Sequence, residues 1–168
     1  MRLHDVTVKP FEQIVDEHGP AVLRACRAML APADADDTWS ETFLAALRAY
    51  PRLRPDSNVR AWLLTIAHRK AIDLHRAAAR APVPAAAVPE RPATYGIPAE
   101  PDTALRDAVR TLPPKQRGAV VYHYLADLPY HEVGKLLGTS EAAARRSAAD
   151  GIAALRTIYQ ADHQEAAR

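Results

Sequence analysis

The chain has 168 residues, of which 48% are hydrophobic and 25% charged, a composition typical of a globular protein with one or two small domains. Its formal net charge of +2 is too small to indicate a nucleic-acid binder by itself, although residues 103–159 hold eight Lys and Arg against five Asp and Glu. A single cysteine excludes an intramolecular disulfide. Without a signal pattern or an apolar run of about 18 residues, we expect a soluble, cytoplasmic protein.

The first predicted element covers residues 11–29, as one amphipathic helix or as two helices broken near Gly19 and Pro20. Its apolar residues recur at i, i+3 and i+4 spacing; they are Phe11, Ile14, Val15, Val22, Cys26 and Met29. Because Cys26 lies on this apolar stripe, we interpret it as a core cysteine rather than a reactive one.

A second helix is predicted over residues 35–50, with two faces of different character. The apolar face consists of Trp39, Phe43, Ala46, Leu47 and Tyr50. The opposite face consists of Asp37, Ser40, Glu41, Leu44 and Arg48. Two interpretations of that second face stay open: a solvated surface with one stray leucine, or a docking surface for a basic partner helix.

A third helix is predicted over residues 58–76. Its apolar arc consists of Val59, Leu63, Leu64, Ile66, Ala67, Ala71 and Leu74, and its other side carries Thr65, His68, Arg69, Ile72, His75 and Arg76. From the residues alone, an ordinary charged face is the favoured interpretation of this second stripe. Trp62, at the border between the two sides, is expected to pack rather than to bind.

The segment 79–102 differs from both of its neighbours. It holds six prolines between Pro82 and Pro101, and proline at this density blocks helix formation and favours an extended tether. A long loop within one domain is less favoured, since structureless loops beyond about 12–15 residues are uncommon in compact domains. We therefore expect an all-α fold with two small helical domains, residues 1–78 and 103–160, and a polar tail at 161–168.

The C-terminal block is predicted to contain three helices. The first spans residues 115–125 after Pro113 and Pro114, and the second begins after Pro129 and ends at Leu137. A Gly-Thr-Ser turn at 138–140 then caps a helix of about four turns over 141–156. A short helix, a glycine turn and a second helix form the helix-turn-helix pattern, in which Gly134 stands where two crossing helices need a small side chain.

Three segments together resemble the bacterial sigma factors of the extracytoplasmic-function group of the sigma-70 family, which consist of regions 2 and 4 joined by a linker. The segment DADDTWSETFLAAL at 34–47 is similar to the acidic helix that docks on the polymerase clamp helices. The segment NVRAWLLTIAHRKAIDLHR at 58–76 is similar to the helix that helps to melt and read the −10 element. The run from 112 to 140 is similar to the helix-turn-helix that reads the −35 element. The matches follow the family's order and cover nearly the whole chain.

The resemblance implies three sets of site residues. The polymerase-binding set consists of Asp36, Asp37, Ser40, Glu41 and Leu44. The −10 set consists of Arg54, Ser57, Asn58, Thr65, His68, Arg69 and Arg76. The −35 set consists of Ser140, Ala142, Ala143, Arg145, Arg146 and Ala149. The implied partners are core RNA polymerase, through its clamp helices and flap, and promoter DNA. An anti-sigma factor stays open as a third partner, and no cofactor, metal, membrane or small-molecule substrate is implied.

The chain departs from the family pattern in the helix that would read the −35 element. Arginines or large residues common in the family are replaced by Ser147, Ala149, Asp150 and Ile152. Helical projection places Ala142, Arg145, Arg146 and Ala149 on the outer face and Ala144, Ala148, Gly151 and Leu155 toward the core. With Arg145 and Arg146 as the remaining cations, we expect a weak or narrow −35 contact.

Two further departures concern the other sites. Ser40 replaces the family's usual glutamine in the docking helix, which shortens its reach toward the polymerase. His68 and Arg69 replace a frequent Arg-Asn pair, so an unusual −10 preference is expected.

Two alternatives stand beside a working sigma factor. One is a sigma-like regulator that binds core polymerase or an anti-sigma partner with weak or no −35 recognition. The other is an enzyme, which is disfavoured because the zinc-protease pattern begun by His131 and Glu132 lacks its second ligand at Lys135. His68 and His75 share a helical face without a third ligand, so no metal site is expected there.

Overall fold

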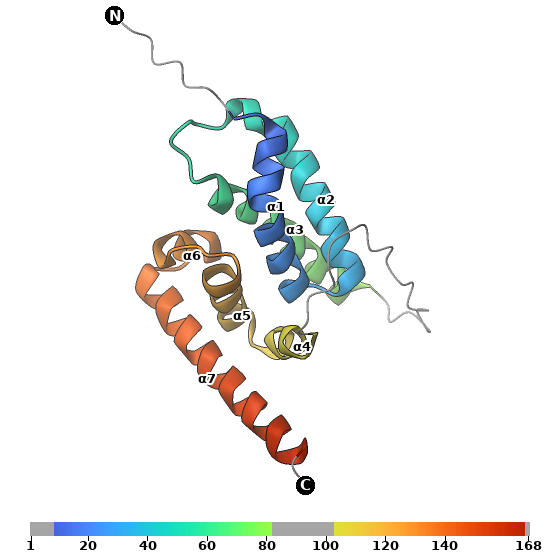
Figure 1. The fold of residues 1–168 in the computed structure, drawn as a ribbon, viewed down its shortest axis with the longest axis vertical. Coiled ribbons are helices and arrows are strands. Elements are labelled where there is room, and N and C mark those ends of the chain that lie inside the picture. Colours follow the sequence, from blue (N-terminus) through green and yellow to red (C-terminus); the bar gives the residue numbers. More distant parts are fainter. Residues whose placement is uncertain (1–8, 82–102, 167–168) are drawn as a thin grey trace, which may run out of the picture.

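The computed structural model describes residues 9–81 and 103–166, and it shows helices joined by short turns (Figure 1). The N-terminal half contains α1 (Phe11–Met29), α2 (Pro32–Ala49), a 3-10 turn η1 (Tyr50–Arg52) and α3 (Val59–Arg80). The C-terminal half contains α4 (Thr103–Thr111), α5 (Pro114–Val120), a π-helical turn η2 (Val121–Leu125), α6 (Tyr130–Leu137) and α7 (Glu141–Ala166). No strand occurs in the two described ranges, and the predicted all-α fold class is confirmed.

The first helix is continuous across Pro20, which settles the question of a break at that point. Proline inside a helix removes one backbone hydrogen bond and costs about 3 kcal/mol. Burial on both sides of the proline offsets this cost, because Gly19, Ala21 and Val22 are all buried. The indole Nε1 of Trp39 on α2 also donates to the backbone carbonyl of Gly19 at 3.0 Å, which ties α2 to α1 at this position.

Aromatic side chains join the three helices of the N-terminal half. Phe11 meets the rings of Phe43 and Tyr50 edge-on, at centroid distances of 6.4 and 5.4 Å. Trp39 packs against Phe43 at 4.8 Å, and Trp62 lies 6.4 Å from Tyr50. Trp62 is therefore a packing residue, as predicted. Cys26 is also a core residue, 3% exposed, and burial raises the pKa of its thiol to about 12.

Two glycines allow the helices of the C-terminal half to approach closely. A Cβ on Gly134 of α6 would lie 2.9 Å from the carbonyl oxygen of Thr139 and 3.1 Å from the amide nitrogen of Glu141. A Cβ on Gly151 of α7 would lie 2.6 Å from Cγ2 of Val120. The distances of 2.9 and 2.6 Å are too short for a side chain without movement of a neighbour, which confirms the predicted role of Gly134 in helix crossing.

Several element boundaries differ from the sequence-based expectations. Helix α3 continues to Arg80, two residues into the expected linker, and the remainder of that linker, from residue 82, lies outside the described residues. The short helix α4 was not expected. Helix α7 continues to Ala166, well beyond the expected helix end near residue 156 and into the predicted polar tail at 161–168. The proposed domain limits stay a prediction.

The predicted apolar face of α2 also needs one correction. Leu47, expected on the buried face, is 51% exposed. Thr38 and Thr42, which were not assigned to that face, are buried. The hydroxyl of Thr42 donates to the carbonyl oxygen of Thr38 at 2.6 Å, whereas the buried hydroxyl of Thr38 has no hydrogen-bond partner among the described residues.

Candidate nucleic-acid and partner interfaces

The helix-turn-helix of the C-terminal half is formed by α6, a three-residue turn and α7. Gly138 ends α6 in the left-handed conformation, with φ of 66°, which glycine adopts without strain. The hydroxyl of Ser140 accepts from the amide of Ala143 at 3.1 Å and so caps the first turn of α7. The Gly-Thr-Ser segment thus forms the predicted turn and cap, and the cap occupies the hydroxyl of Ser140.

The first turns of α7 present one small-residue face to the core and one to solvent. Ala144 and Ala148 are 0% exposed and Gly151 is buried, as the helical projection predicts. The exposed residues of the outer face are Ala142, Arg145, Arg146, Ala149 and Asp150. Ala143 is half-buried at the border of this face. The structure therefore gathers most of the predicted −35 set on one accessible strip.

The two arginines of this strip have different surroundings. The guanidinium of Arg145 lies 2.8 Å from Oε1 of Glu141 and 4.7 Å from the ring centroid of Tyr130 on α6. Among the described residues, no carboxylate or aromatic ring lies against Arg146. Arg146 is consequently the less restrained cation, while Arg145 is held between an acid and a ring.

The predicted −10 residues follow α3 and the loop before it. Asn58 caps α3 by accepting from the amide of Ala61 at 3.0 Å, and Arg54 pairs with Asp56 at 3.1 Å in the loop. Arg54 and Asn58 are exposed, and Ser57 is half-buried. From Asn58 to Arg76 the chain advances by about 27 Å along the helix axis. This set is therefore a line along one helix and not a compact pocket.

Within α3 the predicted stripe is only partly accessible. Arg69 and Arg76 are exposed, whereas Thr65 donates its hydroxyl to the carbonyl of Ala61 at 2.8 Å. His68 is half-buried, with Nδ1 2.7 Å from Oη of Tyr122 on η2. Burial lowers the pKa of His68.

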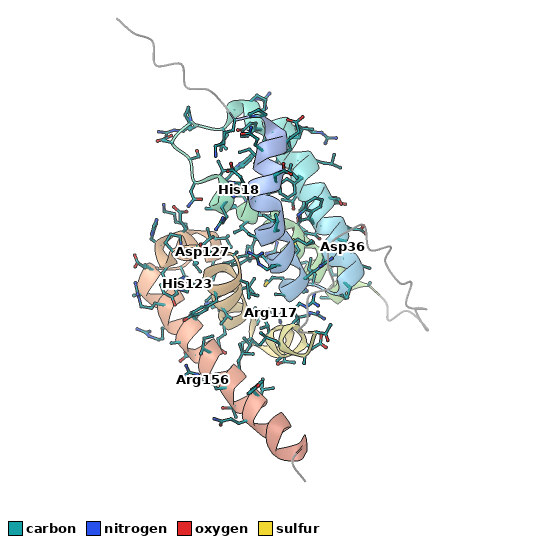
Figure 2. The ribbon with its side chains drawn as sticks, in the orientation of Figure 1. His18, Asp36, Arg117, His123, Asp127 and Arg156 are labelled. Carbon is teal, nitrogen blue, oxygen red and sulfur yellow. The ribbon has the colours of Figure 1, made fainter. Side chains whose placement is uncertain are left out.

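The His68 contact belongs to a larger contact between the two halves of the chain. Nε of Arg24 on α1 donates to the carbonyl oxygen of Leu125 at 3.3 Å, and Arg60 on α3 pairs with Asp127 at 3.4 Å. Figure 2 labels His123, which lies in η2, and Asp127, which lies in the segment between η2 and α6. Asp127 has a positive φ of 57°. Sequence patterns could not predict this contact, because the residues that it joins are more than 50 positions apart in the chain.

The acidic face of α2 forms the third candidate surface. Asp37, Ser40, Glu41 and Leu44 are exposed, Leu44 to 56%. Asp36 is half-buried and lies 3.4 Å from Arg27 on α1, so it is partly occupied within the fold. A groove of about 320 Å³ beside this face is lined by Asp34, Asp37, Thr38, Glu41, Lys70, Asp73 and Leu74. Four of these seven residues are acidic, a charge that suits a basic partner surface.

Neither a metal site nor a membrane-spanning helix is found among the described residues. No group of three or more His, Cys, Asp and Glu side chains in the described ranges is arranged to hold a metal ion. No helix in the same ranges is long and apolar enough to cross a membrane.

Two family models match the chain, in the same order as the two structural halves. Residues 14–81 match the model described as Sigma-70 region 2, and residues 102–155 match the model described as Sigma-70, region 4. The RNA polymerase sigma factor CarQ of Myxococcus xanthus is 30% identical over 99% of this chain and 99% of its own length. The ECF RNA polymerase sigma factor ShbA of Streptomyces griseus is 33% identical, covering 84% of this chain and 83% of its own length.

Solved structures with the same fold include two protein complexes. The chain matches CnrH, in complex with the cytosolic domain of CnrY, with a TM-score of 0.68 and 27% identity over 90% of this chain and 88% of that one. It matches RpoE, in complex with the anti-sigma factor NepR from Bartonella quintana, with a TM-score of 0.74 over 90% of this chain and 98% of that one. At 19% identity this second match shows the fold alone.

Proposed function

The chain belongs to the sigma-70 family, in the extracytoplasmic-function group of RNA polymerase sigma factors, and on that premise we propose how its helices share the recognition of a promoter. It is a transcription initiation factor, which binds core RNA polymerase and directs it to specific promoters. Helices α1–α3 correspond to region 2 and helices α4–α7 to region 4.

The −35 element is assigned to the N-terminal turns of α7. The observation that supports this assignment best is the division of this helix into a core face of Ala144, Ala148 and Gly151 and an exposed strip that carries Arg145 and Arg146. A helix of this kind fits the major groove, where arginine pairs bidentately with guanine. Each such contact contributes about 1–3 kcal/mol of discrimination, so two arginines suffice for a narrow specificity.

The −10 element is assigned to α3 and the loop before it. Arg69 and Arg76 supply exposed cations for the phosphates of a melted strand, and Arg54 and Asn58 offer polar groups beside the helix start. His68 faces Tyr122 of region 4, so its use in DNA binding requires regions 2 and 4 to separate there.

Core polymerase is assigned to the exposed face of α2. Asp37 and Glu41 supply negative charge, although the carboxylate of Glu41 lies 3.3 Å from Nζ of Lys70 on α3. Leu44 supplies exposed apolar area between charged neighbours. A partner surface with basic residues around an apolar patch would complement this face. We assign Ser40 to the same contact and give Asp36 a minor part, because Arg27 already pairs with it.

The cytoplasm, where core polymerase and promoter DNA meet, is the proposed place of action, and no catalytic step is assigned to this chain itself. A further protein partner is part of the proposal, because CnrH, at 27% identity, forms a complex with the cytosolic domain of CnrY.

Reconstituted transcription tests this proposal. The purified chain is added to core polymerase on a library of genomic fragments, and the 5′ ends of the transcripts are mapped. We expect start sites that share a −10 and a −35 sequence and that vanish when the chain is omitted. Binding to core polymerase without promoter-specific transcripts would instead support the sigma-like regulator that lacks −35 recognition.

A further inference from the structure

Three side chains are layered at the edge of the helix-turn-helix. The imidazole of His123 on η2 stacks on the ring of Tyr130 at the start of α6, with centroids 3.8 Å apart and planes 16° from parallel. The guanidinium of Arg145 lies over the ring of Tyr130, 4.7 Å from its centroid. We propose that Tyr130 is a positioning residue for Arg145 in reading the −35 element, an inference that rests on the −35 role proposed for Arg145.

The lower layers of this stack are anchored to the fold. Nδ1 of His123 lies 2.8 Å from the carbonyl oxygen of Leu128, and since a carbonyl only accepts, Nδ1 carries the proton and donates. Leu128 is itself 2% exposed, so the imidazole is fixed to buried backbone. Tyr124 meets His123 edge-on, with ring centroids 4.7 Å apart. The ring of Tyr130 thus stacks on an imidazole that is itself anchored to the fold.

The geometry of the upper layer suits base recognition. A guanidinium that stacks flat on an aromatic face keeps its N–H donors, which point outward in its plane, free for other partners. These are the donors that pair with O6 and N7 of a guanine. The ring restricts the rotamers of Arg145 without consuming its hydrogen-bonding capacity, so less conformational entropy is lost when DNA binds.

Glu141 holds the same arginine in a different way. Its carboxylate lies 2.8 Å from Nη2 of Arg145 and occupies a donor that a base would need. Its negative charge also repels DNA phosphates that come near Arg145, so this ion pair weakens the arginine's contact with DNA while it persists. The neutral ring is the partner that can remain in place when Arg145 turns toward a base.

Arg146 provides an internal comparison. It is exposed on the same strip, one residue further along α7, and among the described residues no ring lies against it. If Tyr130 acts through Arg145, the effect of removing Tyr130 on binding should depend on whether Arg145 is present and should not depend on Arg146.

The test measures DNA specificity in the complete holoenzyme. Competition binding measures the specificity ratio, which is the affinity for a promoter found by start-site mapping divided by the affinity for the same promoter with a scrambled −35 sequence. The proteins compared are the wild type, Tyr130→Leu, Tyr130→Phe, Arg145→Ala, Arg146→Ala and the double variants. We expect Tyr130→Leu to lower the specificity ratio about three- to tenfold and Tyr130→Phe, which keeps the ring, to retain it. In the Arg145→Ala background Tyr130→Leu has no further effect, whereas in the Arg146→Ala background its effect is undiminished.

The outcomes separate this inference from the function on which it rests. An unchanged ratio in Tyr130→Leu, together with a reduced ratio in Arg145→Ala, overturns the positioning role and leaves the −35 assignment intact. An unchanged ratio in Arg145→Ala overturns the −35 assignment of that arginine itself. If Tyr130→Leu lowers the unfolding midpoint, the same measurement is made with Tyr130→Met, whose unbranched side chain has a similar reach. Its unfolding midpoint is compared with that of the wild type.

Discussion

Nδ1 of His68 in region 2 lies 2.7 Å from Oη of Tyr122 in region 4, with the two rings edge-to-face at 82°. Tyr122 is 2% exposed, so its hydroxyl has no access to bulk water and depends on this imidazole for a partner. Burial raises the pKa of Tyr122 far above its ordinary value, which keeps the phenol protonated and able to donate to a neutral His68. A residue assigned to promoter recognition is therefore engaged within the protein when DNA is absent.

Removing the hydroxyl should weaken the contact between the halves. The Tyr122→Phe variant leaves Nδ1 of His68 without its partner, and we expect the free energy of unfolding to fall by about 1 kcal/mol. Denaturant titration measures this change. Tyr124→Phe serves as the matched control, because Tyr124 is 54% exposed and loss of its hydroxyl should cost less than about 0.5 kcal/mol. Equal stabilities of the two variants would show that the His68–Tyr122 bond contributes nothing.

The same contact should respond to pH. Burial lowers the pKa of His68 in the packed state, so the packed state binds a proton less readily than a chain in which His68 is exposed. The stability that this contact supplies is therefore present above the ordinary histidine pKa, about 6.5, and is lost as the pH falls below that value. An NMR titration of the His68 imidazole checks the sign: a midpoint at or above the ordinary value contradicts the packed arrangement, and Tyr122→Phe should move the midpoint upward.

The sequence predicted the helices better than it predicted their contacts. Periodic apolar residues located α2 and α3, and the Gly-Thr-Ser segment located the turn before α7, because both signals are local. The continuity of α1 could not be predicted, since it depends on burial of the residues beside Pro20 and on Trp39, which donates to the Gly19 carbonyl from another helix. The contact of His68 with Tyr122 likewise depends on tertiary structure alone.

In the recognition helix, too, local features were predictable and tertiary contacts were not. Its buried and exposed faces follow from the 3.6-residue repeat and were predicted correctly. The ring of Tyr130 under Arg145 was not predicted, because it lies 15 positions away in the preceding helix and α6 has to cross α7 to bring it there. The local pattern thus identified the arginine, but its surroundings could be seen only in the fold.

The crossing of α6 and α7 should fail when Gly134 gains a side chain. A Cβ there would lie 2.9 Å from the carbonyl oxygen of Thr139, and backbone cannot move aside as a flexible side chain can. We expect Gly134→Ala to lower the free energy of unfolding by about 1–3 kcal/mol and to weaken promoter binding in parallel. Gly138→Asn is the control: nothing lies within 4 Å of its Cβ position, and asparagine tolerates the φ of 66° better than most residues. A stable, fully active Gly134→Ala variant would refute this packing argument.

The exposed leucine of α2 should matter for the polymerase and not for folding. Leu44 is 56% exposed, so Leu44→Ser should change the free energy of unfolding by less than about 0.5 kcal/mol. Loss of an apolar anchor within a protein interface costs about 1–2 kcal/mol or more, which corresponds to a roughly five- to thirtyfold weaker affinity for core polymerase. Titration of labelled protein with core polymerase measures this affinity. The control is Leu47→Ser, at a similarly exposed leucine outside the proposed docking face, and equal affinities of the two variants would speak against the assignment.

The most direct test of the account compares single-round transcription from a mapped promoter and from its −35-scrambled copy, with holoenzymes that carry the wild type, Arg145→Ala or Arg146→Ala. Because an arginine–guanine pair supplies about 1–3 kcal/mol of discrimination, we predict that each substitution lowers the ratio of the two transcript yields at least about fivefold. The yield from the scrambled copy should stay nearly constant. If both variants keep the wild-type ratio, α7 does not read the −35 element through these arginines, and the central assignment is wrong.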